Sequence, residues 1–188
     1  MKFKELLEKT EFIKNYSNKK PKVELIINAI EAANMGPSAG NLQPIQYVIV
    51  EDPEGIAAIA EACQQSFIAK APYVIIITSD LTQMERLYDG HGSKYLKQNV
   101  GAAIQNLTLQ LAESKISTSL VAPFSDATLK NHFGIPDGKE IEMIIPAGEG
   151  IGGPVRKKKP SLVNKIFYDS FGNKTHGSRP SQVSRKDI

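Results

Sequence analysis

Six consecutive residues, Tyr73 to Thr78 (YVIIIT), narrow the range of possible folds more than any other stretch of this sequence. Aromatic and β-branched side chains favour a strand, and an unbroken apolar run is typical of a strand whose two faces are both covered. We therefore expect this strand to lie at the centre of a sheet, with structure packed on each side. With 188 residues, the chain is long enough for one compact domain with a sizeable core.

Helical spacing of apolar residues predicts helices before and after this strand. Between residues 21 and 35, for example, Val23, Ile26 and Ile30 fall on one face of a helix. We predict helices over residues 2–9, 21–35, 56–68, 95–113 and 126–133, and further strands over residues 47–50 and 141–147. The polar residues 80–94 are interpreted as an irregular connection, with a mobile excursion over a site as the alternative. Because helices and strands interleave without a repeat, we expect a single α/β or α+β layered domain.

Charge is unevenly distributed along the chain. Residues 156–188 contain nine Lys or Arg against two Asp, a balance of +7, whereas residues 1–155 contain 14 basic and 18 acidic residues, a balance of −4. A cationic C-terminal segment indicates an anionic ligand at that end or a solvated tail. Nucleic acid is not the expected partner, because neither a zinc-ligand spacing nor a basic motif with interleaved aromatic residues accompanies the charge.

The sequence also predicts where the protein resides and which chemistry it lacks. Apolar runs stay well short of the roughly 20 residues that cross a bilayer, and the first residues are too charged for a secretory signal. A cytoplasmic protein without a membrane partner is therefore expected.

Cys63, the only cysteine, is interpreted as a packing residue. The three histidines lie outside any metal-binding or nucleophile motif, so neither a metal site nor a catalytic side chain is predicted. If a bound cofactor supplies the reactivity, the protein needs mainly to bind, orient and tune it.

Two segments have the composition of a cofactor site. In PSAGNLQP, residues 37–44, small side chains let the backbone approach a flat ligand, and the amides of Asn41 and Gln43 offer paired donors and acceptors. That pattern matches an imide edge such as that of a flavin, and the alternative is a helix stop followed by a turn. The second segment, RKKKP at residues 156–160, can hold a phosphate by charge-assisted hydrogen bonds, and its alternative is a solvated charge run.

These segments follow one another in an order that resembles the FMN-dependent nitroreductase family. The similarity extends from about Glu8 to Gly172, and its most specific element is PSAGNLQP. The resemblance implies an α+β nitroreductase-like fold with a central, mostly antiparallel sheet flanked by helices. It also implies an interlocked homodimer with two FMN sites at the interface. We expect the FMN-binding domain to span residues 1–174, followed by a basic tail over residues 175–188.

The resemblance assigns roles to individual residues. The positions that would bind the cofactor are Lys14, Pro37, Ser38, Ala39, Asn41, Gln43, Ala122, Pro123, Arg156 and Lys158. Lys14 would lie beside N1 and O2 of the ring, where a cation stabilises the anionic reduced flavin. The loop amides would lie near the polar edge of the ring, the backbone of Ala122 and Pro123 near N5, and the two C-terminal cations at the phosphate.

The sequence departs from the family pattern at two places. Where the family has Arg-Arg-Ser-x-Arg before an aromatic residue, residues 10–14 read TEFIK, so only the final cation is retained. Loss of an Arg and a hydroxyl from the phosphate clamp predicts FMN binding weaker by about ten- to hundred-fold, since a charged hydrogen bond contributes ~1.5–3 kcal/mol. The second departure, SKIST at residues 114–118 in place of a Gly-containing turn, affects the contacts near N5.

Two functions follow as hypotheses. The first is an FMN-dependent oxidoreductase that takes hydride from NADH or NADPH and passes electrons to a nitroaromatic, a quinone or a similar flat acceptor. The second is a flavin-binding or regulatory protein on a reductase scaffold with weak or no turnover, and it follows from the altered N-terminal motif. The sequence leaves the physiological acceptor open and does not distinguish NADH, NADPH or a protein as the electron donor.

Overall fold

The computed structural model describes residues 3–10, 12–153 and 159–177, and it divides into two compact units, Met1–Val155 and Arg156–Ile188. The first unit, called the body, contains all the helices and strands that the described residues form. The described part of the C-terminal unit consists of turns and bends. Within the described ranges, no helix is both long enough and apolar enough to span a bilayer.

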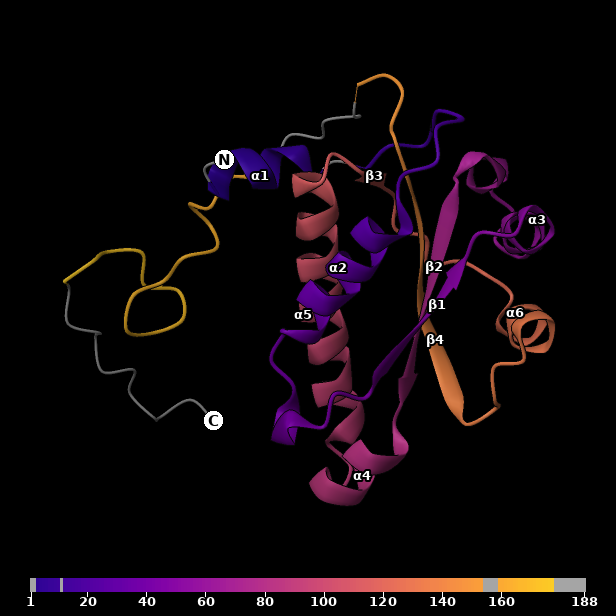
Figure 1. Ribbon diagram of the computed structural model, residues 1–188. Helices are drawn as coiled ribbons and strands as arrows, with labels where there is room; N and C mark the ends of the chain where they lie inside the picture. Colours follow the sequence, from indigo (N-terminus) through magenta and orange to yellow (C-terminus); the bar gives the residue numbers. More distant parts are fainter. Residues whose placement is uncertain (1–2, 11, 154–158, 178–188) are drawn as a thin grey trace. The chain divides into compact units, whose positions relative to one another are not determined.

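A four-stranded antiparallel sheet forms the centre of the body (Figure 1). Its strands are, in spatial order, β1 (Ile45–Val50), β2 (Tyr73–Asp80), β4 (Lys139–Gly148) and β3 (Ser117–Thr118). Every residue of β2 from Tyr73 to Ser79 is buried, which confirms the predicted central strand. The strand β3 was not predicted, because two residues are too few to show the alternation that marks a strand.

Helices cover both faces of the sheet (Figure 1). On one face lie α2 (Val23–Asn34), α4 (Thr82–Tyr88) and α5 (Gly92–Glu113), and on the other lie α3 (Pro53–Ala62) and α6 (Asp126–Phe133). Ile75 and Ile77 belong to the apolar cluster beneath α2 and α5, whereas Val74 and Ile76 belong to the cluster on the opposite face. This alternation follows from the two-residue period of a strand. The predicted α+β architecture, an antiparallel sheet flanked by helices, is confirmed.

The structure corrects two predicted elements. Residues 80–94 do not form an irregular connection, because α4 occupies much of that stretch and α5 already begins at Gly92. The Asp80 side chain accepts the N–H of Thr82 at 2.9 Å and so satisfies one of the free N–H groups at the start of α4. The helix predicted over residues 56–68 is divided into α3 and the 3₁₀ helix η2 (Ser66–Lys70), since Gln64 between them has a left-handed backbone (φ 53°).

The N-terminal chain forms α1 (Phe3–Lys9), as predicted, and then follows the β3 edge of the sheet. The N–H of Ile13 donates to the carbonyl of Thr118 at 3.0 Å. Tyr16 is buried, and its hydroxyl donates to the Pro146 carbonyl at 3.2 Å. These contacts hold the segment that carries Lys14 against the sheet.

Candidate functional site

The loop PSAGNLQP connects α2 to β1 and contains a short 3₁₀ helix, η1 (Ala39–Asn41). Gly40 (φ 61°), Asn41 (φ 54°) and Gln43 (φ 47°) all have a left-handed backbone. Glycine adopts this conformation readily and Asn more often than most residues, whereas Gln is held there against its preference. The N–H of Gln43 donates to Ser38 Oγ at 2.9 Å, and this bond closes the loop.

The amide side chains of this loop are paired with each other. Gln43 Nε2 donates to Asn41 Oδ1 at 3.3 Å; Asn41 is exposed and Gln43 half-buried. With this bond made, Asn41 keeps its Nδ2 donor and Gln43 its Oε1 acceptor for a ligand. A neighbouring donor and acceptor complement the imide edge of a flavin, which presents an N–H between two carbonyl oxygens. The donor set of the loop therefore fits the polar edge of an FMN ring.

An aromatic pair that is not among the predicted site residues packs beside this loop. A Cβ on Gly40 would lie only 2.9 Å from Tyr88 Oη, so the glycine and the tyrosine hydroxyl occupy adjoining space. The Tyr88 ring meets the Tyr95 ring edge-on, with centroids 5.0 Å apart. Tyr88 is the last residue of α4, in the stretch predicted to be irregular, and no periodicity in the sequence directs it to the loop.

Lys14 lies exposed on the N-terminal segment, above an aromatic ring. Its Nζ is 5.0 Å from the ring centroid of Phe67 on η2, within the range of a cation–π interaction. The ring orients the ammonium group without neutralising its charge. A ligand that develops negative charge would meet an available cation here.

Ala122 and Pro123 are both exposed at the end of the chain segment that follows β3. The preceding residue, Val121, donates its N–H to the carbonyl of Ile144 at 2.9 Å and remains part of the sheet. Proline has no N–H, so only Ala122 of this pair can donate a backbone hydrogen bond to a ligand atom such as flavin N5. Of the two residues predicted near N5, only Ala122 can therefore contribute a backbone N–H.

The predicted phosphate-binding residues Arg156 and Lys158 lie outside the described residues. The neighbouring cation Lys159 is described and is exposed. The phosphate end of the site stays a prediction from the sequence.

The loop of residues 37–44 and the N-terminal segment that carries Lys14 lie towards opposite ends of α5 (Figure 1). The loop is attached near the start of this helix, where Asn99 Nδ2 donates to the Pro37 carbonyl at 2.7 Å. The N-terminal segment is attached beyond the end of the helix, at β3. From Asn99 to Glu113 the helix rises about 21 Å, at 1.5 Å per residue. One copy of the chain therefore brings the loop residues together, whereas Lys14 is attached beyond the other end of α5.

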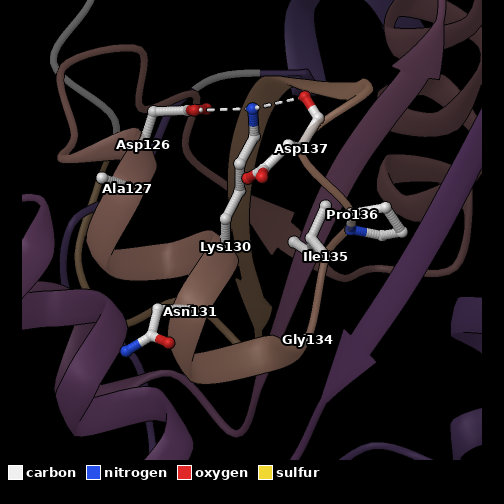
Figure 2. Close-up of a pocket in the computed structure, with 8 residues that line it drawn as sticks. All are labelled: Asp126, Ala127, Lys130, Asn131, Gly134, Ile135, Pro136 and Asp137. Carbon is white, nitrogen blue, oxygen red and sulfur yellow. Dashed lines mark hydrogen bonds and ion pairs between the residues drawn. The ribbon is translucent and has the colours of Figure 1, made fainter.

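A surface pocket of about 510 Å³ lies elsewhere, at the end of α6 (Figure 2). The residues that line it are Asp126, Ala127, Lys130, Asn131, Gly134, Ile135, Pro136 and Asp137. Lys130 Nζ forms an ion pair with Asp126 at 2.9 Å and donates to the Asp137 carbonyl at 3.4 Å. Among the predicted site residues that the structure describes, none lines this pocket, so it is separate from the loop and from Lys14.

Comparison with known proteins defines the class to which this fold and loop belong. The model of the nitroreductase family matches residues 8–70 and 60–149, which together exceed half of the chain. The structure is also similar to that of a nitroreductase family protein from Clostridium difficile 630, with a TM-score of 0.79, 25% identity, and coverage of 90% of this chain and 99% of that one. The chain belongs to the nitroreductase family, as its motifs predicted.

Individual relatives carry the names of different activities. The chain is 26% identical to a Streptococcus pyogenes protein provisionally named as an NAD(P)H nitroreductase, over 79% of this chain and 90% of that protein. It is 22% identical to an iodotyrosine deiodinase from Thermotoga neapolitana, over 77% and 86% of the two chains. An iodotyrosine deiodinase crystallised with FMN and 3-iodo-L-tyrosine has the same fold, with a TM-score of 0.76, 21% identity, and coverage of 89% and 99%. The protein is thus an oxidoreductase of this family whose acceptor the family does not define.

Proposed function

We propose that this protein binds FMN and uses it to pass hydride from NADH or NADPH to a nitroaromatic, a quinone or a similar flat acceptor. The observation that carries the proposal is the loop of residues 37–44, whose left-handed backbone presents a donor and an acceptor side by side to the edge of a flat ring. Family membership supports the same cofactor, because a structural neighbour holds FMN.

A complete site requires two copies of the chain, and we propose an interlocked homodimer. Because about 21 Å of helix lies between the attachments of the loop and of the N-terminal segment, the loop of one copy and Lys14 of the other would meet at one ring. Exposed apolar side chains support this assembly: Leu7 on α1, Ile27 on α2, and Met35 at the end of α2 are 43%, 43% and 84% exposed. Met35 also lines a groove of about 240 Å³ between α1, α2 and α5. A second copy would cover these surfaces.

FMN supplies the hydride-accepting ring in such a site, and the residues of this chain bind and orient it. The Lys14 ammonium, held over Phe67, favours negative charge at the pyrimidine end of the ring. The Ala122 N–H would donate towards N5. Asn41 and Gln43 would align the polar edge of the ring, and the cations of RKKKP would hold the phosphate.

The second candidate is a flavin-binding or regulatory protein with weak or no turnover, and one observation favours it. Thr10 carries the only hydroxyl of the altered motif TEFIK, and it donates that hydroxyl to the Leu7 carbonyl at 2.8 Å. The hydroxyl is therefore engaged by the end of α1 instead of being directed at a ligand. Together with the missing Arg, this contact predicts a weakened phosphate clamp.

The visible absorption spectrum of the freshly purified protein, followed by anaerobic titration with NADH and NADPH, tests the proposal. A yellow protein whose flavin bleaches with either donor supports the oxidoreductase. Flavin that stays oxidised with both donors counts against a nicotinamide donor and favours the binding protein. A colourless protein that does not bind added FMN in calorimetry contradicts both. Turnover with a nitroaromatic, a quinone and 3-iodo-L-tyrosine then separates the classes of acceptor.

A further inference from the structure

The side chain of Asn99 is buried on α5 in a way that packing alone does not explain. It is 3% exposed, and its Nδ2 donates to the Pro37 carbonyl at 2.7 Å. Its Oδ1 is also buried and has no hydrogen-bond partner among the described residues. An unpaired buried oxygen costs free energy that a leucine of similar size would avoid. The reason for an asparagine at this position is therefore the hydrogen bond that its Nδ2 donates to the Pro37 carbonyl.

That bond lies at the point where the candidate loop begins. Pro37 is the first residue of PSAGNLQP, and beyond it the loop is closed by two bonds to Ser38: the N–H of Gln43 to the hydroxyl and the N–H of Asn41 to the carbonyl, both at 2.9 Å. These internal bonds determine the shape of the loop. The bond from Asn99 fixes the position of the loop on the body, because Asn99 belongs to a helix whose inner face is packed in the core.

We infer that Asn99 is a positioning residue of the flavin site, which holds the Pro37 carbonyl and so sets where the Asn41 and Gln43 amides meet the ring edge. The inference rests on the proposed FMN function. Without the bond, the loop is held less firmly on the body, so its internal hydrogen bonds open more often and the donor and acceptor no longer stay aligned with the ring. FMN affinity then falls although no residue that touches the ring has changed.

The same helix offers a matched control. Asn106, two turns further along α5, donates its Nδ2 to the Ala32 carbonyl on α2 at 3.3 Å. This bond also joins α5 to a backbone carbonyl, but it does not involve residues 37–44. Because Asn106 also lines the groove that a second copy would cover, FMN is titrated at protein concentrations at which sedimentation shows all three proteins to be dimers. The variants Asn99→Leu and Asn106→Leu therefore remove the same kind of bond from the same helix, and only the first is expected to affect flavin.

The test compares the wild type with both variants by FMN calorimetry, thermal unfolding of the flavin-free protein, and hydrogen exchange of the loop amides. We expect Asn99→Leu to raise the FMN dissociation constant by about tenfold, the effect of one hydrogen bond, and to speed exchange of the Gln43 N–H. For Asn106→Leu we expect an FMN dissociation constant within about twofold of the wild type. Equal FMN affinity in all three proteins, with only the melting temperature lowered, would overturn the inference.

Failure of the proposed function gives a different pattern. If the wild type does not bind FMN, that function fails, and exchange of the Gln43 N–H in the flavin-free protein decides the role of Asn99. Faster exchange in Asn99→Leu alone supports loop positioning, whereas equal exchange in the three proteins contradicts it. If Asn99→Leu does not fold, the smaller variant Asn99→Ser is measured in the same way.

Discussion

Asp80 serves two elements with one carboxylate. One of its oxygens accepts Lys139 Nζ at 2.7 Å, which joins β2 to β4, and the other accepts the N–H of Thr82 at 2.9 Å, which begins α4. The hydrogen bond from Lys139, followed by those from Thr82, lowers the pKa of Asp80 to about 2. The helix α4 that carries Tyr88 to the candidate site therefore starts from a carboxylate that remains ionised in acid.

We predict that Asp80→Asn weakens the dependence of stability on pH. The pKa of Asp80 is about 2 in the folded protein and about 3.9 in an unfolded chain. The ionised carboxylate therefore contributes stability above about pH 4, and this contribution is lost as the pH falls towards 2. Urea titrations across this range should show a free energy of unfolding that falls less steeply in the variant than in the wild type. Parallel curves for the two proteins would show that Asp80 has no such role.

Among the elements, α5 organises the candidate site. Its inner face packs in the core, the loop is attached to it at Asn99, and the N-terminal segment is attached beyond its end, at β3. The outer face includes Gly101, exposed in mid-helix, where a Cβ would meet no described atom within 4 Å. Glycine inside a helix is less stable than alanine by roughly 0.5–1 kcal/mol. Nothing in the described part of one copy explains this glycine, whereas close approach of a second copy would.

We predict that Gly101→Leu weakens the proposed dimer. Within one copy the change should stabilise α5, because leucine is the better helix former; at an interface, the added side chain would separate the two surfaces. Sedimentation should show a dimer dissociation constant raised by about tenfold or more, equivalent to ~1.4 kcal/mol. Ala127→Leu, an exposed position on α6, is the control and should leave association unchanged. A more stable variant with unaltered association would remove α5 from the interface.

At the scale of the whole molecule, the candidate site is divided between the two ends of the body. Lys14 and the loop 37–44 face the same ring edge in the proposed function, but in one copy they are attached on either side of the stretch of α5 from Asn99 to Glu113, over which the helix rises about 21 Å. A dimer resolves this separation, because each of its two sites would take Lys14 from one copy and the loop from the other.

A mixed dimer tests this arrangement. We predict that Lys14→Ala and the double variant Asn41→Ala/Gln43→Ala each lose FMN when purified as homodimers. A mixed dimer of the two has one site with every defect and one site with none, so it should retain one FMN. Flavin absorbance per dimer, after purification through a different tag on each chain, measures this number. If Lys14 and the loop served a site within one chain, the mixed dimer would have no intact site and would bind as poorly as its parents.

Much of the fold and of the chemistry could be predicted from the sequence, because both depend on neighbours along the chain. The run from Tyr73 to Thr78 identified the central strand, since a buried strand needs only its own residues to be recognised. The small residues and the Asn in PSAGNLQP likewise permit the left-handed backbone that the loop adopts. The helix α4 was missed because seven residues are too few to show a clear helical period.

The sequence by itself determined the local shape and the functional groups of this protein: the buried strand, the loop with its two amides, and the cation at Lys14. Only the tertiary structure decided which residues support those groups. Phe67 lies under Lys14 and Asn99 holds Pro37, in each case more than 50 residues away along the chain. Such pairs depend on how helices pack on a sheet, and packing leaves no period in the sequence that could identify the partner.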